Sequence, residues 1–361
     1  MKLVIDIRLI NASGIGTYLK NVVPGILPVF DEVSVLGNFD EIQRFDWSKD
    51  VEIIPFNAGI YSIKEQILFP FVVPKCDLLW CPHFNVPLFP VKASKIVTTI
   101  HDVYHLSENA AISYLKKSYA KILFQNAVSK ADLIFTISEF SKSEILKYTA
   151  ADFKKIELVY CGVNKSYFQD ARFESDLKLP QNYILYVGNI KPHKNLIVLL
   201  KAYATFSDEF KLKYSLVFVG KKEGFITEDN EIQKFMVEND LQKNIIFTGY
   251  IGDSEIPKIY REANLFVFPS LYEGFGLPIL EALATQTKVI SSNAASLPEA
   301  GGEAVTYFDP KNYIQLAEII KKNIEDSSKN DFLLAQGEKQ LEKFTWEKSI
   351  NNHLKALKKL R

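Results

Sequence analysis

The 361-residue sequence lacks several features that would assign it to particular protein classes. It has no apolar run of about 18 residues, so we expect no membrane-spanning helix. Its 43 basic and 43 acidic residues leave no net charge, which removes a bulk electrostatic argument for nucleic-acid binding. Only three cysteines are present, Cys76, Cys81 and Cys161, an odd number whose first spacing fits no common zinc pair. We expect them to be reduced and buried thiols.

The N-terminus lacks the marks of a secretory signal peptide. The stretch MKLVIDIRLI carries Asp6 and Arg8 inside its apolar run, and no small-residue cleavage site follows. We therefore expect a strand at this end and a cytoplasmic protein. The composition, 47% hydrophobic and 24% charged, is that of an ordinary globular chain, and the length favours two domains.

Short apolar runs recur along the chain and are separated by helix-length segments. The runs are residues 3–7, 33–36, 51–54, 78–80, 96–100, 133–137 and 156–160, then 183–187, 215–219, 244–247, 265–269, 288–291 and 304–307. This alternation predicts an α/β fold with two doubly wound parallel sheets. We expect an N-terminal domain over residues 1–165, a second domain over 166–343, and an amphipathic helix over 344–361.

The segment 265–284, LFVFPSLYEGFGLPILEALA, combines a buried strand, a loop with two glycines and the start of a helix. Gly274 and Gly276 allow the backbone to approach a ligand closely. Amides at the positive end of a helix favour an anion such as a phosphate. Glu273 and Glu281 bracket this site, which suggests a phosphate that carries hydroxyl-rich groups on either side.

The string EGFGLPILE, residues 273–281, resembles the E-x7-E motif of family 4 retaining glycosyltransferases of the GT-B fold. The resemblance implies two Rossmann-like domains that face each other across a cleft, with acceptor-side and nucleotide-sugar domains and a final helix that returns to the first domain. It implies that Glu273 binds the donor sugar and Glu281 the nucleotide ribose. The diphosphate would meet the loop amides of Gly274, Phe275, Gly276 and Leu277. For either glutamate alone a structural role is an equal alternative: Glu273 would be a solvated loop acid, and Glu281 would complement a helix dipole.

Two glycines, Gly14 and Gly16, follow the first apolar run in NASGIGTYL. They lack the third glycine of a dinucleotide fingerprint, which argues against an NAD site. The resemblance implies that this loop faces the donor phosphates and the acceptor. A plain glycine turn before a helix is the alternative.

His101 follows the fifth apolar run, in TTIHDVYHL, at the end of a strand where ligands bind in parallel sheets. A histidine beside Asp102 at such a place is a candidate functional residue. The resemblance implies that His101 lies near the donor sugar and the reacting centre, and His83 is a candidate for the acceptor side. Packing is the alternative for either ring.

Three serines lie in TISEFSKSEIL, at the end of the sixth run and after it. Ser141 and Glu144 match a capping box, which predicts that a helix begins there. Ser138 and Glu139 either line the site, as the resemblance implies, or form a plain loop and cap.

A basic turn, GNIKPHKNL, begins at Gly188 after the first strand of the second domain. We expect Asn195 to cap the next helix, which puts His193 and Lys194 at a helix N-terminus, where a cation is disfavoured unless an anion binds. Lys194 is therefore a candidate diphosphate ligand and catalytic residue, as the resemblance also implies. The family's G-R-L opening is absent, so His193 or Lys191 would supply any second cation. Ordinary surface residues are the alternative.

Two further segments carry weaker signals. FTGYIGD, residues 247–253, resembles the segment that seats the nucleotide base, so Tyr250 and Ile251 are candidate base contacts, with loop packing as the alternative. Residues 60–130 hold eight lysines and four acids, and 112–132 is typical of a basic helix. Such a patch suits an anionic membrane surface, with a solvated helix face as the alternative.

The resemblance implies a retaining hexosyltransferase that uses a nucleotide diphosphate sugar and a glycan or lipid-linked saccharide acceptor. TIHDVYHL and GNIKPHKN resemble mannosyltransferases of bacterial surface polysaccharide assembly, so GDP-mannose is the first expected donor and a UDP-hexose the second. No Asp-x-Asp string occurs, and we expect neither metal nor cofactor. The alternatives are a nucleotide-sugar epimerase or glycan phosphorylase on the same architecture, and a non-catalytic glycan-binding protein.

Overall fold

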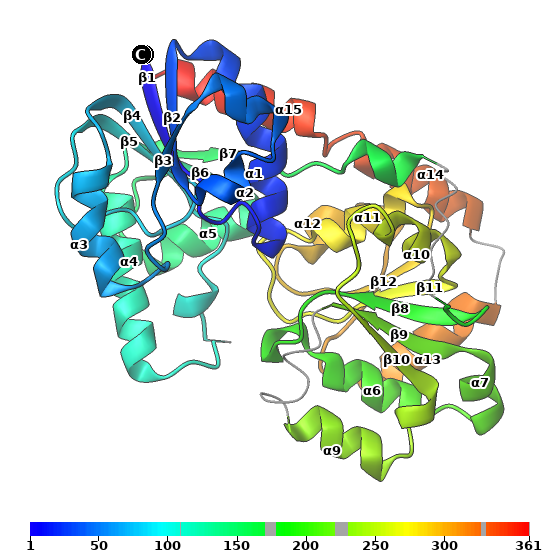
Figure 1. Cartoon of the computed structure of the whole chain (residues 1–361). Coiled ribbons are helices and arrows are strands. Elements are labelled where there is room, and N and C mark those ends of the chain that lie inside the picture. The colour runs from blue at the N-terminus through cyan, green and yellow to red at the C-terminus, as the bar shows by residue number, and fades with distance from the viewer. Residues whose placement is uncertain (109, 170–177, 221–229, 326–329, 361) are drawn as a thin grey trace. The chain divides into compact units, whose positions relative to one another are not determined.

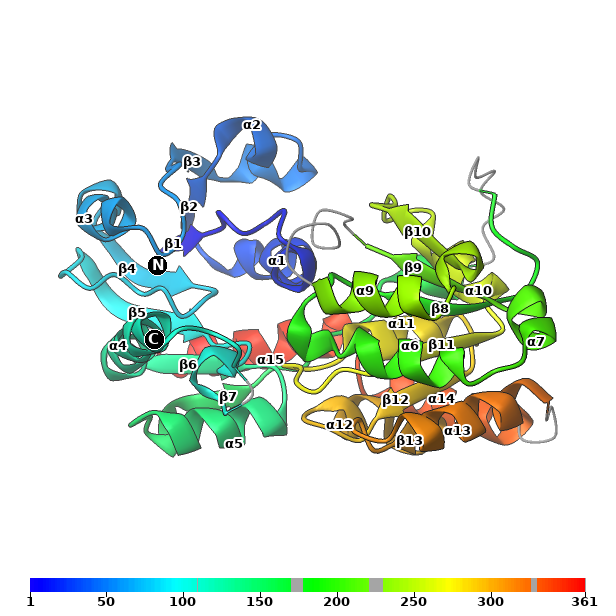
Figure 2. The same cartoon turned by 90° about the horizontal axis from the view of Figure 1, so that it is seen from below.

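The computed structural model describes residues 1–361 except 109, 170–177, 221–229, 326–329 and 361. The chain forms two compact units, one of Met1–Gly162 with Thr345–Arg361 and one of Val163–Phe344. Each unit contains one parallel sheet between layers of helices (Figures 1 and 2). The predicted α/β fold with two doubly wound parallel sheets is therefore confirmed.

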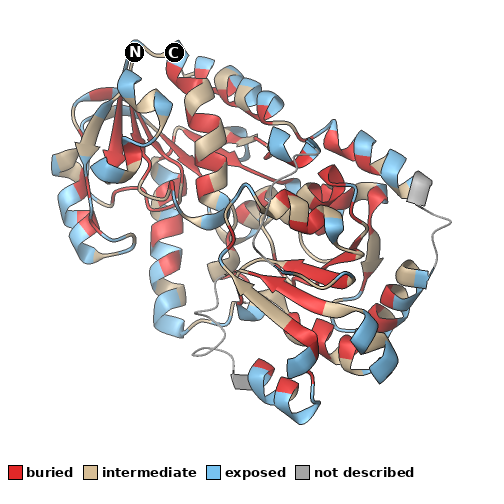
Figure 3. Cartoon of the chain, turned by 45° about the vertical axis from the view of Figure 1, so that its right-hand side comes forward, coloured by how far each residue is buried: buried red, intermediate tan, exposed pale blue. Residues whose placement is uncertain are grey.

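The sheet of the first unit has seven strands within the described residues, in the order β3-β2-β1-β4-β5-β6-β7. Every pair is parallel, and most strand residues are buried (Figure 3). The seven predicted runs correspond to the seven strands. Their bounds are β1 Lys2–Asp6, β2 Glu32–Gly37, β3 Glu52–Pro55, β4 Cys76–Cys81, β5 Ala93–Thr99, β6 Leu133–Thr136 and β7 Ile156–Leu158.

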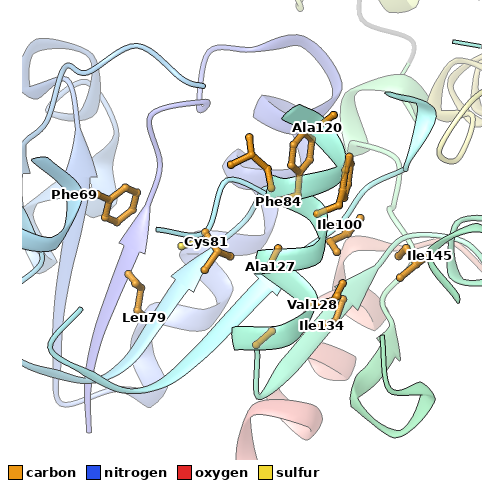
Figure 4. Packing of buried hydrophobic residues seen from close by; sticks show 14 of the residues in the cluster. Phe69, Leu79, Cys81, Phe84, Ile100, Ala120, Ala127, Val128, Ile134 and Ile145 are labelled. Carbon is orange, nitrogen blue, oxygen red and sulfur yellow. The ribbon is translucent and has the colours of Figure 1, made fainter. Parts of the chain in front are cut away.

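Helices cover both faces of this sheet. The α-helices are α1 Ser13–Ile26, α2 Phe39–Ile42, α3 Ile63–Val72, α4 Tyr114–Lys130, α5 Glu139–Tyr148 and α15 Trp346–Lys358. Helices α3, α4 and α5 lie against one face, and α1 and α15 contact each other on the opposite face (Figure 2). Figure 4 shows the apolar layer that α3, α4 and α5 form with the strands, including Phe69, Phe84, Ile134 and Ile145.

The second unit repeats the plan with six described strands in the order β10-β9-β8-β11-β12-β13. The strands are β8 Tyr183–Val187, β9 Ser215–Val219, β10 Ile245–Gly249, β11 Leu265–Phe268, β12 Val289–Ser292 and β13 Thr306–Phe308. Helices α6, α9 and α13 lie on one side of the sheet and α10, α11, α12 and α14 on the other (Figure 1). The helices are α6 Leu196–Ala204, α7 Asp208–Lys213, α9 Asn230–Glu238, α10 Ile256–Glu262, α11 Leu277–Ala284, α12 Leu297–Gly301, α13 Tyr313–Glu325 and α14 Asn330–Leu341.

Each sheet has one point where the direction of strand addition reverses. In the first unit β1 pairs with both β2 and β4, and in the second β8 pairs with both β9 and β11. Ligands of open parallel sheets bind outside the carboxyl ends of strands at such points. The loops that follow β8 and β11 are therefore the first place to look for a site in the second unit.

Two local predictions need correction. Helix α5 begins at Glu139, one turn before the predicted start, because the Ser138 side chain caps it by accepting a hydrogen bond from the Ser141 amide at 2.9 Å. The predicted capping box of Ser141 and Glu144 is therefore wrong. Helix α1 begins at Ser13, so Gly14 and Gly16 lie inside its first turns and not in a loop that precedes it.

Other expectations concern burial and membrane helices. The three cysteines are free and buried, as predicted. Among the described residues, no helix combines the length and the apolar character that crossing a bilayer would require. Residues 163–181, around the predicted domain boundary, fall partly outside the described residues, and their described part includes the short 3-10 helix Lys165–Phe168.

The C-terminal helix α15 packs into the first unit through a buried polar cluster. The hydroxyl of Tyr18 on α1 lies 2.5 Å from Nε2 of His353 on α15, and both side chains are fully buried. Trp80 Nε1 donates to Thr99 Oγ1 at 3.0 Å beside them. At the start of α15, Gly162 approaches so closely that an added Cβ would lie 2.1 Å from the amide nitrogen of Trp346.

We predict that Gly162→Ala lowers the free energy of unfolding by about 1–3 kcal/mol or more, because the clash is with backbone that cannot rotate away. Gly14→Ala is the matched control, since an added Cβ meets nothing within 4 Å there. The control should leave stability unchanged or raise it by at most about 1 kcal/mol, because alanine favours a helix over glycine. Calorimetric melting compares the two, and equal melting temperatures would contradict the close approach.

Candidate functional site

The candidate site of the second unit begins where β8 and β11 end side by side. These strands pair in parallel, with Ile184 opposite Leu265 and Leu185 opposite Phe266. Because their registers match, the loops 188–195 and 269–276 leave the sheet next to each other. The amide of Leu271 donates to the carbonyl of His193 at 2.7 Å and ties the two loops together.

Lys194 and Glu273 meet between these loops. Lys194 Nζ lies 2.6 Å from Glu273 Oε1, and the two side chains are only 17% and 14% exposed. The ammonium also lies 5.6 Å from the centre of the Phe268 ring. A salt bridge this well shielded from water interacts more strongly than a surface pair. The structure thus brings together two of the three predicted catalytic residues.

Asn195 occupies the predicted capping position before α6, but its side chain makes no capping hydrogen bond. Its backbone is in the left-handed region, with φ 56° and ψ 38°. The side-chain amide donates to the carbonyls of Pro269 at 3.1 Å and Pro310 at 2.8 Å. The predicted side-chain cap is therefore wrong. Asn195 instead fastens the Lys194 turn to the segments that follow β11 and β13.

The N-terminus of α11 lies beside the salt bridge. The helix begins at Leu277 after Gly276, whose φ of 121° is rarely adopted by residues with a side chain. A Cβ there would lie 3.1 Å from the Leu297 side chain and 3.2 Å from Ala300. Ser296 Oγ hydrogen-bonds to the carbonyls of Glu273 and Phe275, at 2.9 and 2.8 Å. The loop 273–276 is thus held in one conformation at a helix end that favours anions.

Glu281 lies one turn into α11 in an environment unlike that of Glu273. The hydroxyl of Tyr260 donates to its Oε2 at 3.1 Å, and the hydroxyl of Tyr167 also hydrogen-bonds to the carboxyl group. Burial raises the pKa of Glu281 to about 7, although these hydroxyls favour the charged form. The nearby Asp253 adds to the increase. Glu281 is thus a half-buried acid whose pKa is raised to about 7.

The carboxyl ends of β8, β9 and β10 each carry a glycine. An added Cβ on Gly220 would lie 2.2 Å from the carbonyl oxygen of Gly188, and the Gly220 amide donates to the Gly249 carbonyl at 3.1 Å. All three have positive φ. Sequence reasoning singled out Gly188 but missed Gly220 and Gly249. The available signal was that a glycine follows or ends each of these three apolar runs.

The predicted base contacts differ in exposure. Tyr250 is 70% exposed, whereas Ile251 is buried. They follow Gly249, where the register between β10 and β9 shifts. The ring of Tyr250 is therefore accessible to a ligand, whereas little of the Ile251 side chain is.

His101, in the first unit, is held at both its ring and its backbone. Its Nε2 lies 3.0 Å from the Pro82 carbonyl, and its own carbonyl accepts a hydrogen bond from Ser141 Oγ at 2.8 Å. Because a carbonyl can only accept, Nε2 carries the proton and Nδ1 is the acceptor of the neutral ring. Burial lowers the pKa of His101, so the neutral ring is favoured. The ring also packs edge-on against Tyr18, with 5.0 Å between centroids.

The two predicted glycines of the first unit play different parts. Gly16 is buried, and an added Cβ would lie 2.5 Å from the carbonyl oxygen of Ile10, so this glycine permits close packing. Gly14 is exposed with open space around it. Their contact with a donor stays a prediction.

A buried polar network near the end of β1 escaped sequence reasoning. Arg8 Nη2 lies 2.5 Å from Asp6 Oδ2 and 2.6 Å from Glu65 Oε1, and Glu65 also accepts from Asn85 at 2.6 Å. His83, the candidate on the acceptor side, lies 3.2 Å from Asn85, and burial lowers its pKa to about 3. No spacing in the sequence links these residues. Among the described residues, no group of three or more His, Cys, Asp and Glu side chains is arranged to hold a metal.

Two family models match the chain. The model described as "Glycosyl transferases group 1" matches residues 168–340, and "Glycosyltransferase Family 4" matches residues 60–167. The second-unit match contains the loops that carry Lys194, Glu273 and Glu281.

Individual proteins also resemble the chain. It is 31% identical over 292 residues to O-antigen chain mannosyltransferase B of Escherichia coli, which covers 77% of this chain and 73% of that protein. It is 29% identical over 282 residues to O-antigen chain mannosyltransferase RfbU of Salmonella typhimurium, with the same coverage. The structure of Anabaena Alr3699/HepE in complex with UDP and glucose matches with a TM-score of 0.77 and 17% identity over 99% of each chain, a likeness of fold. The chain therefore belongs to the group 1, family 4 glycosyltransferases and has their GT-B fold.

Proposed function

We propose that this glycosyltransferase moves mannose from GDP-mannose to a glycan or lipid-linked saccharide, with retention of anomeric configuration, during assembly of a bacterial surface polysaccharide. The Lys194–Glu273 contact beside the N-terminus of α11 carries the chemical part of this proposal. The two O-antigen mannosyltransferases support the choice of mannose. A UDP-hexose is the second choice, because the Anabaena protein of the same fold binds UDP and glucose.

Lys194 and the helix end would bind the donor diphosphate. Cleavage of the anomeric bond leaves negative charge on the diphosphate, and fixed amides with a nearby ammonium stabilise charge as it forms. In the unliganded protein Lys194 is paired with Glu273. We infer that the diphosphate takes over Lys194 and frees Glu273 to accept hydrogen bonds from sugar hydroxyls. We assign Glu273 to sugar binding and not to nucleophilic attack. The acceptor hydroxyl is proposed to attack the anomeric carbon on the face from which the diphosphate leaves.

Glu281 would bind the ribose of the nucleotide. An ionised carboxylate accepts hydrogen bonds from a pair of ribose hydroxyls, and two tyrosine hydroxyls already orient this carboxyl group. Tyr250, with its exposed ring, would stack on the base. His101 is proposed to lie beside the donor sugar, where its Nδ1 accepts a hydrogen bond.

We propose that the reaction needs neither metal nor cofactor. The sequence has no Asp-x-Asp string to hold a cation on the diphosphate, and Lys194 with the α11 N-terminus offers positive charge in its place. We further propose a position at the cytoplasmic face of the membrane, where a lipid-linked acceptor would lie. Helix α4, with four lysines and no acidic residue, supports this position.

The donor assignment predicts that GDP and GDP-mannose raise the melting temperature and UDP does not. At about 100 times its dissociation constant, a ligand adds about 2.7 kcal/mol of stability, or roughly 5–10 °C for a unit of this size. Product NMR with a mannoside acceptor should show an α-linkage. Stabilisation by UDP and not by GDP would identify a UDP-sugar as the donor in place of GDP-mannose. Consumption of GDP-mannose without any acceptor would favour an epimerase or hydrolase.

For Lys194→Ala we predict that kcat falls roughly 100- to 1,000-fold, because one stabiliser of the leaving diphosphate is lost. Lys194→Arg should recover part of the rate. Lys321→Ala, at an exposed lysine of α13, is the control and should be unchanged. Steady-state kinetics and melting curves separate a catalytic defect from misfolding, and a wild-type kcat in folded Lys194→Ala would refute this role.

The raised pKa of Glu281 predicts that donor affinity depends on pH. If the ionised form binds ribose, GDP affinity is full above a pKa of about 7 and falls as pH drops through it, by about tenfold between pH 8 and pH 6. Glu281→Gln should bind GDP more weakly at pH 8 and should not show this decrease in affinity between pH 8 and pH 6. Calorimetric titration of GDP into both proteins is the measurement, because the ionisation of GDP's own phosphates affects both equally and cancels in the comparison. Parallel pH profiles of affinity for the wild type and Glu281→Gln would count against the ribose role.

A further inference from the structure

Helix α3 presents several large apolar residues to solvent, whereas two of its polar residues face the interior beside Phe69. Ile63 is 77% exposed, Ile67 51% and Phe71 84%, and their spacing of four places them along one side of the helix. Glu65 is fully buried and Gln66 nearly so. This is the reverse of the usual arrangement for a surface helix, in which the charged face meets water.

The buried polar residues of α3 are satisfied inside the protein. Glu65 pairs with Arg8 at 2.6 Å, and Gln66 Oε1 accepts the Leu88 amide at 2.9 Å. The inward face of the helix therefore has a structural purpose. The outward apolar side chains contribute little to the core of this unit, because they are exposed.

The outward face of α3 continues onto α4. Both helices lie on the same face of the sheet, so their exposed sides point away from it in the same direction (Figures 2 and 3). The loop 86–91 bridges them, because Leu88 bonds to α3 and Asn126 of α4 donates to the Val86 carbonyl at 2.9 Å. Phe89 of this loop is 54% exposed.

Helix α4 adds apolar side chains and positive charge to this face. Tyr114, Leu115 and Ile122 are 82%, 79% and 58% exposed. Lys116 and Lys121 are exposed beside them and make no ion pair within the described residues. We call the exposed side chains of α3, Phe89 and α4 the α3–α4 face.

The charge on the α3–α4 face has one sign. Segments 62–73, 82–92 and 113–130 contain a single acidic residue, Glu65, which is buried against Arg8. The exposed charged residues of these segments, including Lys64, are therefore all lysines, although the whole chain has no net charge and the exposed Glu108 lies in the loop before α4. Large apolar side chains surrounded by lysines match a bilayer whose headgroups are anionic.

We propose that the α3–α4 face docks on an anionic lipid bilayer, with the apolar stripe of α3 inserted among the headgroups and the lysines of α4 against lipid phosphates. This inference deepens the proposed membrane position and does not depend on the identity of the donor. A second copy of the chain fits this face less well, because a two-fold contact would set lysines against lysines.

The test is sedimentation with phosphatidylcholine vesicles, with and without phosphatidylglycerol. We expect binding only with phosphatidylglycerol, weakened as salt rises from about 50 to about 300 mM. Ile67→Ser with Phe71→Ser should reduce binding about tenfold or more, as should Lys116→Glu with Lys121→Glu. Leu212→Ser is the matched control, since Leu212 is 75% exposed on α7 of the other unit and should not matter.

Each other outcome overturns the inference. Absence of vesicle binding would do so, as would binding that survives both substitutions in α3. A dimer in solution that the α3 substitutions dissociate, without vesicle binding, would assign the face to a second copy. Transfer to a water-soluble acceptor is measured in parallel and should be unchanged in all these variants. A protein that binds vesicles but transfers no sugar would refute the proposed function and leave this inference standing.

Discussion

The ion pair between Lys194 and Glu273 depends on the pairing of two strands. The residues are 79 positions apart, and they meet because β8 and β11 are parallel neighbours whose carboxyl ends lie at one edge of the sheet. Asn195 then ties the lysine turn to the carbonyls of Pro269 and Pro310, and Ser296 ties the glutamate loop to α12. The two loops that carry the pair are thus fixed before any ligand arrives, which reduces the reorganisation that binding requires.

The two glutamates of the motif have different surroundings although one short loop and helix carry both. Glu273 has a lysine at 2.6 Å, whereas the contacts described for Glu281 are tyrosine hydroxyls and a nearby aspartate. A cation beside a carboxylate favours its charged form. Burial opposes the charged form, and hydroxyl donors offset only part of that effect. One acid is therefore suited to exchange its cation with a diphosphate. The other is suited to neutral hydroxyl partners, and its charge changes near neutral pH.

Much of the fold was predictable because buried parallel strands are nearly continuous apolar runs. Residues 183–187 and 215–219 were predicted and observed with the same bounds. What failed depended on which side chain the tertiary structure uses. Ser138 and Ser141 both suit a cap, and Ser138 serves because Ser141 Oγ bonds to the His101 carbonyl. The Lys194–Glu273 pairing itself was not readable, since it depends on which strands become neighbours.

Helix α3 shows why a pattern of hydrophobic residues is insufficient to find a buried face. Its isoleucines and phenylalanines suggest a core helix, but beside the buried Phe69 the inward side also carries Glu65, which joins Asp6 as a second carboxylate on Arg8. Turning a charged residue inward rotates Ile63 and Ile67 outward on the same helix. One helix therefore connects the carboxyl edge of the first sheet to the apolar surface of the α3–α4 face. A shift of α3 on docking would act directly on the network of Arg8, Glu65 and Asn85, which links the surface of this unit to the strand ends where its ligand is expected.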